Sequence, residues 1–262
     1  MSKAPSPRER IKAALRRAAK QGQPALVAFL TAGFPTKEGF RATLSAVAEG
    51  ADVVEIGVPF TDPMADGVMI QRSSEQALRN GVTLPWILDE LGLMPPLATP
   101  LLLMSYLNPL LAYGLDRLAI TAVASGVCGF IVPDLPFDES EEFRALLAPL
   151  GLALVQMVTP ISSSDRLAKL ATASQGFVYA VTVTGTTGNS AAAPEQIAEY
   201  LQRVRAVATV PVCAGFGIRS REQIEGLRGL VDGVIVGSAL VEVLERGESP
   251  QRWLAALRPA RR

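Results

Sequence analysis

Eight short apolar runs alternate along the chain with segments that have the periodicity of amphipathic helices. The runs occupy residues 25–31, 53–58, 100–106, 129–134, 153–158, 176–183, 210–215 and 233–237. The clearest helical segments between them are 37–49, 114–125, 139–150 and 194–207. Strands that are separated by helices pair in parallel through right-handed crossover connections. Eight such units within about 250 residues predict an α/β fold, the closed (β/α)8 TIM barrel.

The length and hydrophobicity of the chain fit one domain. Of its 262 residues, 49% are hydrophobic, which suffices for one large core. We therefore expect a single barrel domain over residues 1–262. A doubly wound open sheet is the alternative fold. It is disfavoured because the first run ends in Thr31-Ala32-Gly33-Phe34-Pro35, without the G-x-G-x-x-G turn of such sheets.

Residues 1–22 precede the first run and place Ile11, Leu15 and Ala18 at helical spacing, with basic residues between them. We expect an extra N-terminal helix whose apolar face lies against the barrel. A cleaved transit peptide is the alternative interpretation. Glu9 and the lack of a small-residue cleavage site disfavour it.

Composition excludes several classes of function. Lys plus Arg and Asp plus Glu both number 25, and no basic stripe is interleaved with aromatic residues, so we expect no nucleic-acid partner. The absence of histidine excludes Ser-His and Cys-His nucleophilic pairs and histidine-ligated metal sites, and we expect no metal. Cys128 and Cys213 lie in apolar segments and indicate buried thiols of a reducing compartment, the cytoplasm. No apolar run reaches the roughly 18 residues that a membrane-spanning helix needs.

The second run contains a carboxylate that a buried strand does not ordinarily carry. Strand side chains alternate faces, so Glu55 shares its face with Val53 and Gly57. The loop that follows adds Asp62 and Asp66. Acids at the end of a strand and on the loop after it build active sites in parallel α/β folds. We expect Glu55 to be a general acid or base whose pKa is raised by burial.

Each of these residues also has a structural interpretation. Glu55 could form a buried ion pair, although a buried carboxylate costs several kcal/mol unless it is paired or used. Asp62 and Asp66 could serve turn formation, because Asp-Pro and Asp-Gly are ordinary turn sequences. Tyr106 and Tyr179 could equally be core aromatic residues whose hydroxyl groups are satisfied.

Three glycine-containing turns in the C-terminal half predict a phosphate site. They comprise residues 185–188, 214–218 and 236–239. Glycine lets backbone N–H groups approach an anion closely, and Gly237-Ser238 begins a predicted short helix with a partly positive N-terminus. Loops after the seventh and eighth strands are the usual phosphate site of a barrel. The alternative is that these glycines only make tight strand-to-helix turns.

The longest motif resembles the signature of the tryptophan synthase alpha-chain family. It is Glu55-Ile-Gly-Val-Pro-Phe-Thr-Asp-Pro-Met-Ala-Asp66-Gly. The resemblance covers nearly the whole chain. Its other motifs are Phe29-Leu-Thr-Ala-Gly-Phe-Pro35, Met104-Ser-Tyr-Leu-Asn-Pro109, Val132-Pro-Asp-Leu-Pro136, residues 179–188, Gly215-Phe-Gly-Ile218 and Val236-Gly-Ser238.

The resemblance implies a lyase of L-tryptophan biosynthesis. Members of this family split indole-3-glycerol phosphate into indole and glyceraldehyde 3-phosphate, and pass indole to a beta chain that carries pyridoxal phosphate. By this resemblance Glu55 is the general acid and base, and Asp66 holds the indole N–H. The other implied contacts are Phe29, Tyr106 and Tyr179 around the indole, Thr187 holding Asp66, and Gly188, Gly217, Gly237 and Ser238 at the phosphate.

The resemblance also implies an assembly. Asn108-Pro109 and residues 134–136 resemble the face that meets a beta chain, in a tetramer of two alpha and two beta chains. The family binds no cofactor in the alpha chain itself. The sequence departs from the family pattern at Thr186, where valine is expected, at Met64, where leucine is usual, and at Cys128, where aspartate is common. None of these departures falls on Glu55 or Asp66.

Three other functions stay open at this point. A stand-alone indole-releasing lyase would use the same site without a beta partner. Another phosphate-sugar barrel could be an isomerase or an aldolase, although a Schiff-base aldolase needs a lysine at a strand end and none of the eight runs contains one. A catalytically inactive activator of a beta chain is disfavoured because both Glu55 and Asp66 are retained.

Overall fold

The structure, a computed structural model, describes residues 5–182, 194–215 and 217–258. Eight strands form a closed barrel in chain order, and each neighbouring pair is parallel. The strands are β1 (Ala25–Thr31), β2 (Val53–Gly57), β3 (Leu101–Met104), β4 (Val127–Ile131), β5 (Ala153–Val158), β6 (Val178–Val181), β7 (Val212–Gly215) and β8 (Gly233–Val236). The predicted (β/α)8 barrel is confirmed.

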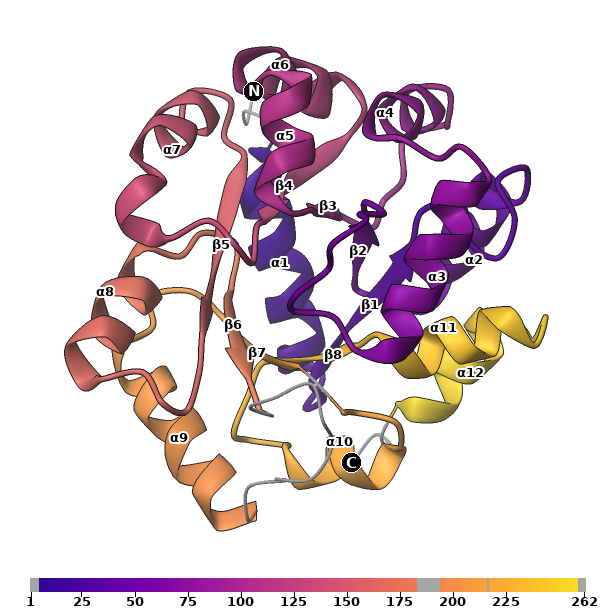
Figure 1. The fold of residues 1–262 in the computed structure, drawn as a ribbon. Coiled ribbons are helices and arrows are strands. Elements are labelled where there is room, and N and C mark those ends of the chain that lie inside the picture. The colour runs from indigo at the N-terminus through magenta and orange to yellow at the C-terminus, as the bar shows by residue number, and fades with distance from the viewer. Residues whose placement is uncertain (1–4, 183–193, 216, 259–262) are drawn as a thin grey trace.

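Helices surround the strands, as Figure 1 shows. In the described residues they are α1 (Pro7–Lys20), α2 (Phe40–Gly50), α3 (Val68–Arg79), α4 (Leu84–Gly92), α5 (Leu107–Tyr113), α6 (Leu115–Ala124), the 3-10 turn η1 (Phe137–Glu139), α7 (Glu141–Leu147), α8 (Ser164–Ala173), α9 (Pro194–Val207), α10 (Arg221–Gly226), α11 (Ser238–Glu245) and α12 (Pro250–Leu257). None of these helices combines the length and the apolar character that crossing a bilayer requires.

Some predicted boundaries were wrong. The fourth strand runs from Val127 to Ile131, not over 129–134, because Pro133 has no N–H to donate to a neighbouring strand. The third strand ends at Met104, since Tyr106 is already the N-cap of α5. The helix predicted over 139–150 is shorter and is preceded by η1.

The strands alternate their side chains between two cores. Leu26 and Val54 pack outward beneath the helices, whereas Val27 and Val53 fill the barrel interior. The register of β1 and β2 pairs Val27 with Val53 and, two residues further along both strands, Phe29 with Glu55. Glu55 therefore points into the interior, at the carboxyl end of the barrel.

The N-terminal helix closes the opposite end of the barrel. Ile11 and Leu15 of α1 are fully buried and belong to the interior core. Their side chains lie beside Gly176 and Gly233, where β6 and β8 begin. Figure 1 shows α1 lying across the strands. The extra helix was predicted, and its position leaves the carboxyl ends of the strands as the open end.

Candidate active site

A cavity opens at the carboxyl ends of the strands. Its empty volume is about 720 Å³, part of it open to solvent, which is within the range of small-molecule sites. Its lining residues are Phe29, Glu55, Asp66, Gly67, Ile70, Met104, Tyr179, Gly217, Ile218, Arg219, Ile235, Gly237, Ser238 and Ala239. Most of the predicted site residues are therefore brought to one place. The predicted contacts Thr187 and Gly188 lie outside the described residues.

Glu55 is fully buried at the floor of this cavity. Neither of its carboxyl oxygens has a hydrogen-bond partner among the described residues. Burial alone raises the pKa of Glu55 to about 8, so the side chain is largely neutral at pH 7. Because no basic residue contributes to this shift, the buried ion pair considered from the sequence is not supported. An unpaired acid in a cavity is instead suited to proton transfer.

Asp66 lies on the loop between β2 and α3 and is 8% exposed. Burial raises the pKa of Asp66 to about 6, although a hydrogen bond from Tyr106 acts in the opposite direction. The second acid of the loop, Asp62, is exposed and accepts a hydrogen bond of 2.5 Å from the hydroxyl of Thr61. The loop thus turns Asp66 into the cavity and Asp62 toward solvent, which fits the turn role of Asp62.

Tyr106 supports the loop that carries Asp66. Its hydroxyl oxygen accepts the backbone N–H of Ala65 at 2.8 Å, and its ring stacks on Phe60 with centroids 5.1 Å apart. Tyr106 lines a recess that adjoins the main cavity and shares Phe29 and Asp66 with it. The contact of Tyr106 with the indole stays a prediction, and in the structure its hydroxyl contacts the loop that carries Asp66.

Tyr179 and Phe29 form aromatic walls that depend on neighbouring glycines. A Cβ atom on Gly215 would lie 2.7 Å from the hydroxyl of Tyr179, and one on Gly57 would lie 2.4 Å from the ring of Phe29. Both distances are too short for real contacts, so each ring occupies space that a larger residue would fill. Burial, together with the charges of Glu55 and Asp66, raises the pKa of Tyr179 and keeps its hydroxyl neutral.

The described residues among the predicted phosphate contacts, Gly217, Gly237 and Ser238, line the same cavity. Gly217 has a φ of 79°, a conformation that glycine adopts without strain. Gly237 is the N-cap of α11 and Ser238 is its first residue, so free backbone N–H groups are present here. A Cβ atom on Gly67, beside Asp66, would lie 4.0 Å from Ser238 Oγ. The residues predicted to bind the phosphate and the loop that carries Asp66 are therefore adjacent.

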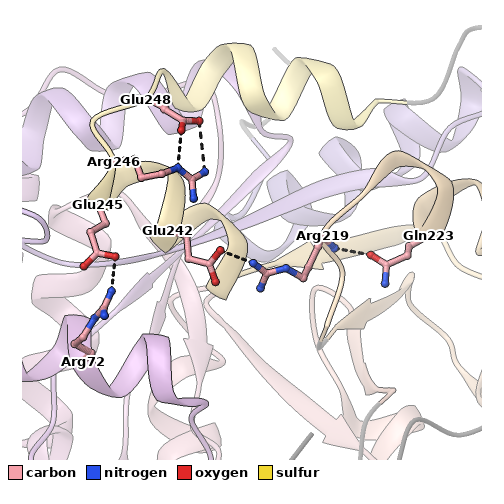
Figure 2. A network of polar contacts seen from close by, with 7 residues as sticks. All are labelled: Arg72, Arg219, Gln223, Glu242, Glu245, Arg246 and Glu248. Atoms are coloured by element: carbon pink, nitrogen blue, oxygen red, sulfur yellow. Dashed lines mark hydrogen bonds and ion pairs between the residues drawn. The ribbon is translucent and has the colours of Figure 1, made fainter.

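Arg219 is a cavity residue that the sequence interpretation did not single out. Its guanidinium forms an ion pair with Glu242 of α11, and its backbone N–H donates to Gln223 Oε1 at 2.7 Å. Figure 2 shows this pair beside the ion pair of Arg72 with Glu245. Arg219 directly follows the Gly-Phe-Gly-Ile motif, and this position in the sequence could have identified it as a site residue.

In the described ranges, no group of three His, Cys, Asp or Glu side chains is placed to hold a metal ion.

Comparisons with known proteins agree over nearly the whole length. Residues 15–259 match the family model of the tryptophan synthase alpha chain. The tryptophan synthase alpha chain of Nitratidesulfovibrio vulgaris (strain DP4) is 45% identical over 249 residues, 94% of this chain and 97% of that protein. The one from Solidesulfovibrio magneticus is 45% identical over 239 residues, 90% and 93% of the two chains. A solved structure of Mycobacterium tuberculosis tryptophan synthase superposes with a TM-score of 0.85 at 37% identity and 95% coverage of each chain. The chain belongs to the tryptophan synthase alpha-chain family.

Proposed function

We propose specific roles for the cavity residues in the reaction of this family. That reaction is the retro-aldol cleavage of indole-3-glycerol phosphate to indole and glyceraldehyde 3-phosphate, a lyase step of L-tryptophan biosynthesis. The observation that carries the assignment is Glu55, a fully buried acid without a described hydrogen-bond partner. It shares one cavity with Asp66 and with the predicted phosphate residues.

Glu55 acts first as an acid and then as a base. The bond to be broken joins a ring carbon of indole to the carbon that carries the neighbouring hydroxyl of the glycerol chain. Neutral Glu55 protonates that ring carbon, which leaves a cation delocalised onto the ring nitrogen. The resulting carboxylate takes the hydroxyl proton as the bond breaks, its electrons return to the ring, and the aldehyde forms. A pKa of about 8 supports this order, because Glu55 begins protonated at neutral pH.

Asp66 stabilises the positive charge that develops on the indole. As a carboxylate it accepts the ring N–H, and this interaction strengthens as the nitrogen becomes positive. A pKa of about 6 leaves Asp66 mostly ionised at pH 7, while Glu55 stays protonated. Two carboxyl groups whose pKa values are separated in this way support an assignment of one as the acid and the other as the charge stabiliser.

The phosphate of the substrate binds the backbone of Gly217 and Gly237 and the first turn of α11 at Ser238. Free N–H groups and the partial positive charge of a helix N-terminus favour an anion there. Phe29 and Tyr179 provide walls for the indole ring. By the family resemblance, Gly188 adds to the phosphate contacts and Thr187 holds Asp66 in place.

The chain works with a tryptophan synthase beta chain, in a cytoplasmic tetramer of two alpha and two beta chains. Pyridoxal phosphate belongs to the beta chain, and the cleavage itself uses only side chains of the alpha chain. Met64 and Val68, near the cavity mouth, are 77% and 75% exposed, which favours a protein partner at this face. Asp134 accepts the backbone N–H of Leu107 at 2.8 Å, so the first turn of α5, which contains Asn108-Pro109, and the segment 134–136 support each other.

Indole release from indole-3-glycerol phosphate tests the assignment. The purified chain is assayed alone and with a tryptophan synthase beta chain, as wild type and as Glu55→Gln. Slow release alone, acceleration by the beta chain and loss of both in the variant are expected. Fast release alone would instead indicate a stand-alone lyase, and full activity of Glu55→Gln would refute the role of Glu55.

A further inference from the structure

The cavity that receives a phosphate ester is itself acidic. Glu55 and Asp66 line it, and Arg219 is the one basic side chain among the described residues of its wall. Backbone N–H groups supply only partial charge to an anion. A phosphate monoester carries close to two negative charges at neutral pH, so a guanidinium beside these N–H groups would strengthen its binding.

Arg219 is anchored close to the phosphate residues. Its backbone N–H donates to Gln223 Oε1 at 2.7 Å, and Gln223 Nε2 donates to the carbonyl of Gly217 at 3.2 Å. Gln223 thereby joins Arg219 to the same turn that presents Gly217. The side chain of Arg219 is 52% exposed, so the guanidinium is free to change rotamer while its backbone stays in place.

The present partner of Arg219 lies one helical turn from the phosphate site. Glu242 and Ser238 are four residues apart on α11 and therefore lie on one face of the helix, with Cβ atoms about 5–6 Å apart. Figure 2 shows the Glu242 carboxylate and the Arg219 guanidinium directed toward each other. A shift of one turn toward the N-terminus brings the guanidinium to an anion at Gly237 and Ser238.

We propose that Arg219 exchanges Glu242 for the phosphate of the substrate and so becomes a substrate-binding residue. This inference rests on the proposed function of the cavity. An ion pair between partly exposed side chains contributes little to stability, so breaking it costs little free energy. Two oxygens of a phosphate can accept two parallel hydrogen bonds from one guanidinium, and this bidentate geometry makes the contact strong. In the structure, Glu242 holds the guanidinium of Arg219 one helical turn from Ser238.

Steady-state kinetics of indole release separate this role from a structural one. Arg219→Gln is expected to raise the KM for indole-3-glycerol phosphate about tenfold, with kcat changed much less. With indole-3-glycerol, which lacks the phosphate, the same variant should behave as wild type. Arg72→Gln is the matched control, since it removes the other ion pair to α11, with Glu245, from a side chain that does not line the cavity. Its KM should equal that of wild type.

Glu242→Gln distinguishes a reserve partner from a structural one. If Glu242 only holds Arg219 back, this variant leaves the KM unchanged or lowers it, opposite to Arg219→Gln. The proposal would be overturned if Glu242→Gln and Arg219→Gln raised the KM equally, or if Arg72→Gln raised it as much as Arg219→Gln. It would also be overturned if Arg219→Gln lost as much activity on indole-3-glycerol as on indole-3-glycerol phosphate. Calorimetric titration with inorganic phosphate measures binding without turnover, and Arg219→Gln should bind phosphate more weakly than wild type. If wild type binds phosphate but releases no indole, the proposed function fails while the role of Arg219 is still decided.

Discussion

The hydroxyl oxygen of Tyr106 accepts the backbone N–H of Ala65 at 2.8 Å, and this hydrogen bond joins the segment after β3 to the loop after β2. Tyr106 therefore holds the backbone of that loop directly beside Asp66. The Tyr106 hydroxyl also lowers the pKa of Asp66, against the larger effect of burial. We classify Tyr106 as a positioning residue.

Tyr106→Phe should move the acidic limb of the pH–activity profile. Without the hydroxyl, burial acts unopposed on Asp66, so its pKa rises above about 6 and a higher pH is needed to ionise it. At pH 6 the loss of kcat/KM should be several-fold greater than at pH 8. The measurement is kcat/KM for indole release across this range.

Tyr200→Phe is the matched control for this change. Tyr200 is also buried, and its hydroxyl donates to the carbonyl of Val158 at 2.8 Å, on a different side of the barrel wall. The variant loses one buried hydrogen bond, about 1 kcal/mol of stability, without contact with Asp66. An equal shift of the acidic limb in both variants would show that Tyr106 has no specific effect on Asp66.

Wild-type kcat/KM should follow a bell-shaped curve with its maximum between about pH 6 and pH 8. Activity rises as Asp66 ionises near pH 6 and falls as Glu55 loses its proton near pH 8. Asp66→Asn keeps the shape of the side chain and removes its charge, so the acidic limb should disappear along with most of the activity. An acidic limb that survives in Asp66→Asn would assign that ionisation to another group.

The barrel was predictable from the sequence because its strands are buried on both faces and therefore appear as continuous apolar runs. Glu55 was identifiable for the same reason, since an acid interrupts one of those runs. Strand ends were less predictable. The start of β4 was predicted at Gly129, but the strand begins at Val127, directly after the Ser125-Gly126 turn in which Gly126 has a φ of 77°.

Contacts between distant segments could not be predicted from local patterns. The support of Asp66 by Tyr106 and the pairing of Arg219 with Glu242 each join separate βα units, whose relative rotation only the closed barrel defines. Asp62 and Asp66 are both followed by turn-forming residues, and their sequence gives no sign of which one faces the cavity. Packing of the loop against Tyr106 makes that choice.

Glu55 should make the stability of the fold depend on pH. Its pKa in the folded state is raised to about 8 from 4.5, so between these values the unfolded chain has lost a proton that the folded chain retains. The free energy of unfolding therefore falls as pH rises from about 4.5 to about 8, by on the order of 4 kcal/mol from this group. Glu55→Gln cannot ionise and removes this contribution.

Urea unfolding of both proteins at pH 5 and pH 8 measures the effect. The two should be close in stability at pH 5, where Glu55 is neutral in the folded state. At pH 8 the Gln variant should be the more stable protein, while it has lost at least a hundredfold in activity. An equal difference at both pH values would mean that Glu55 titrates normally and has a partner in solution.

Gly215→Ala should disturb the aromatic wall of the site. The new methyl group would lie 2.7 Å from Tyr179, a ring that is 4% exposed and closely packed, so the ring or the strand must shift. Overpacking of this kind costs about 1–3 kcal/mol, and displacement of a cavity wall should lower kcat/KM roughly ten- to a hundredfold. Gly226→Ala is the control, because a Cβ atom there meets nothing within 4 Å at the exposed end of α10. Thermal unfolding and indole release are measured for both, and wild-type activity in Gly215→Ala would show that Tyr179 does not shape the substrate site.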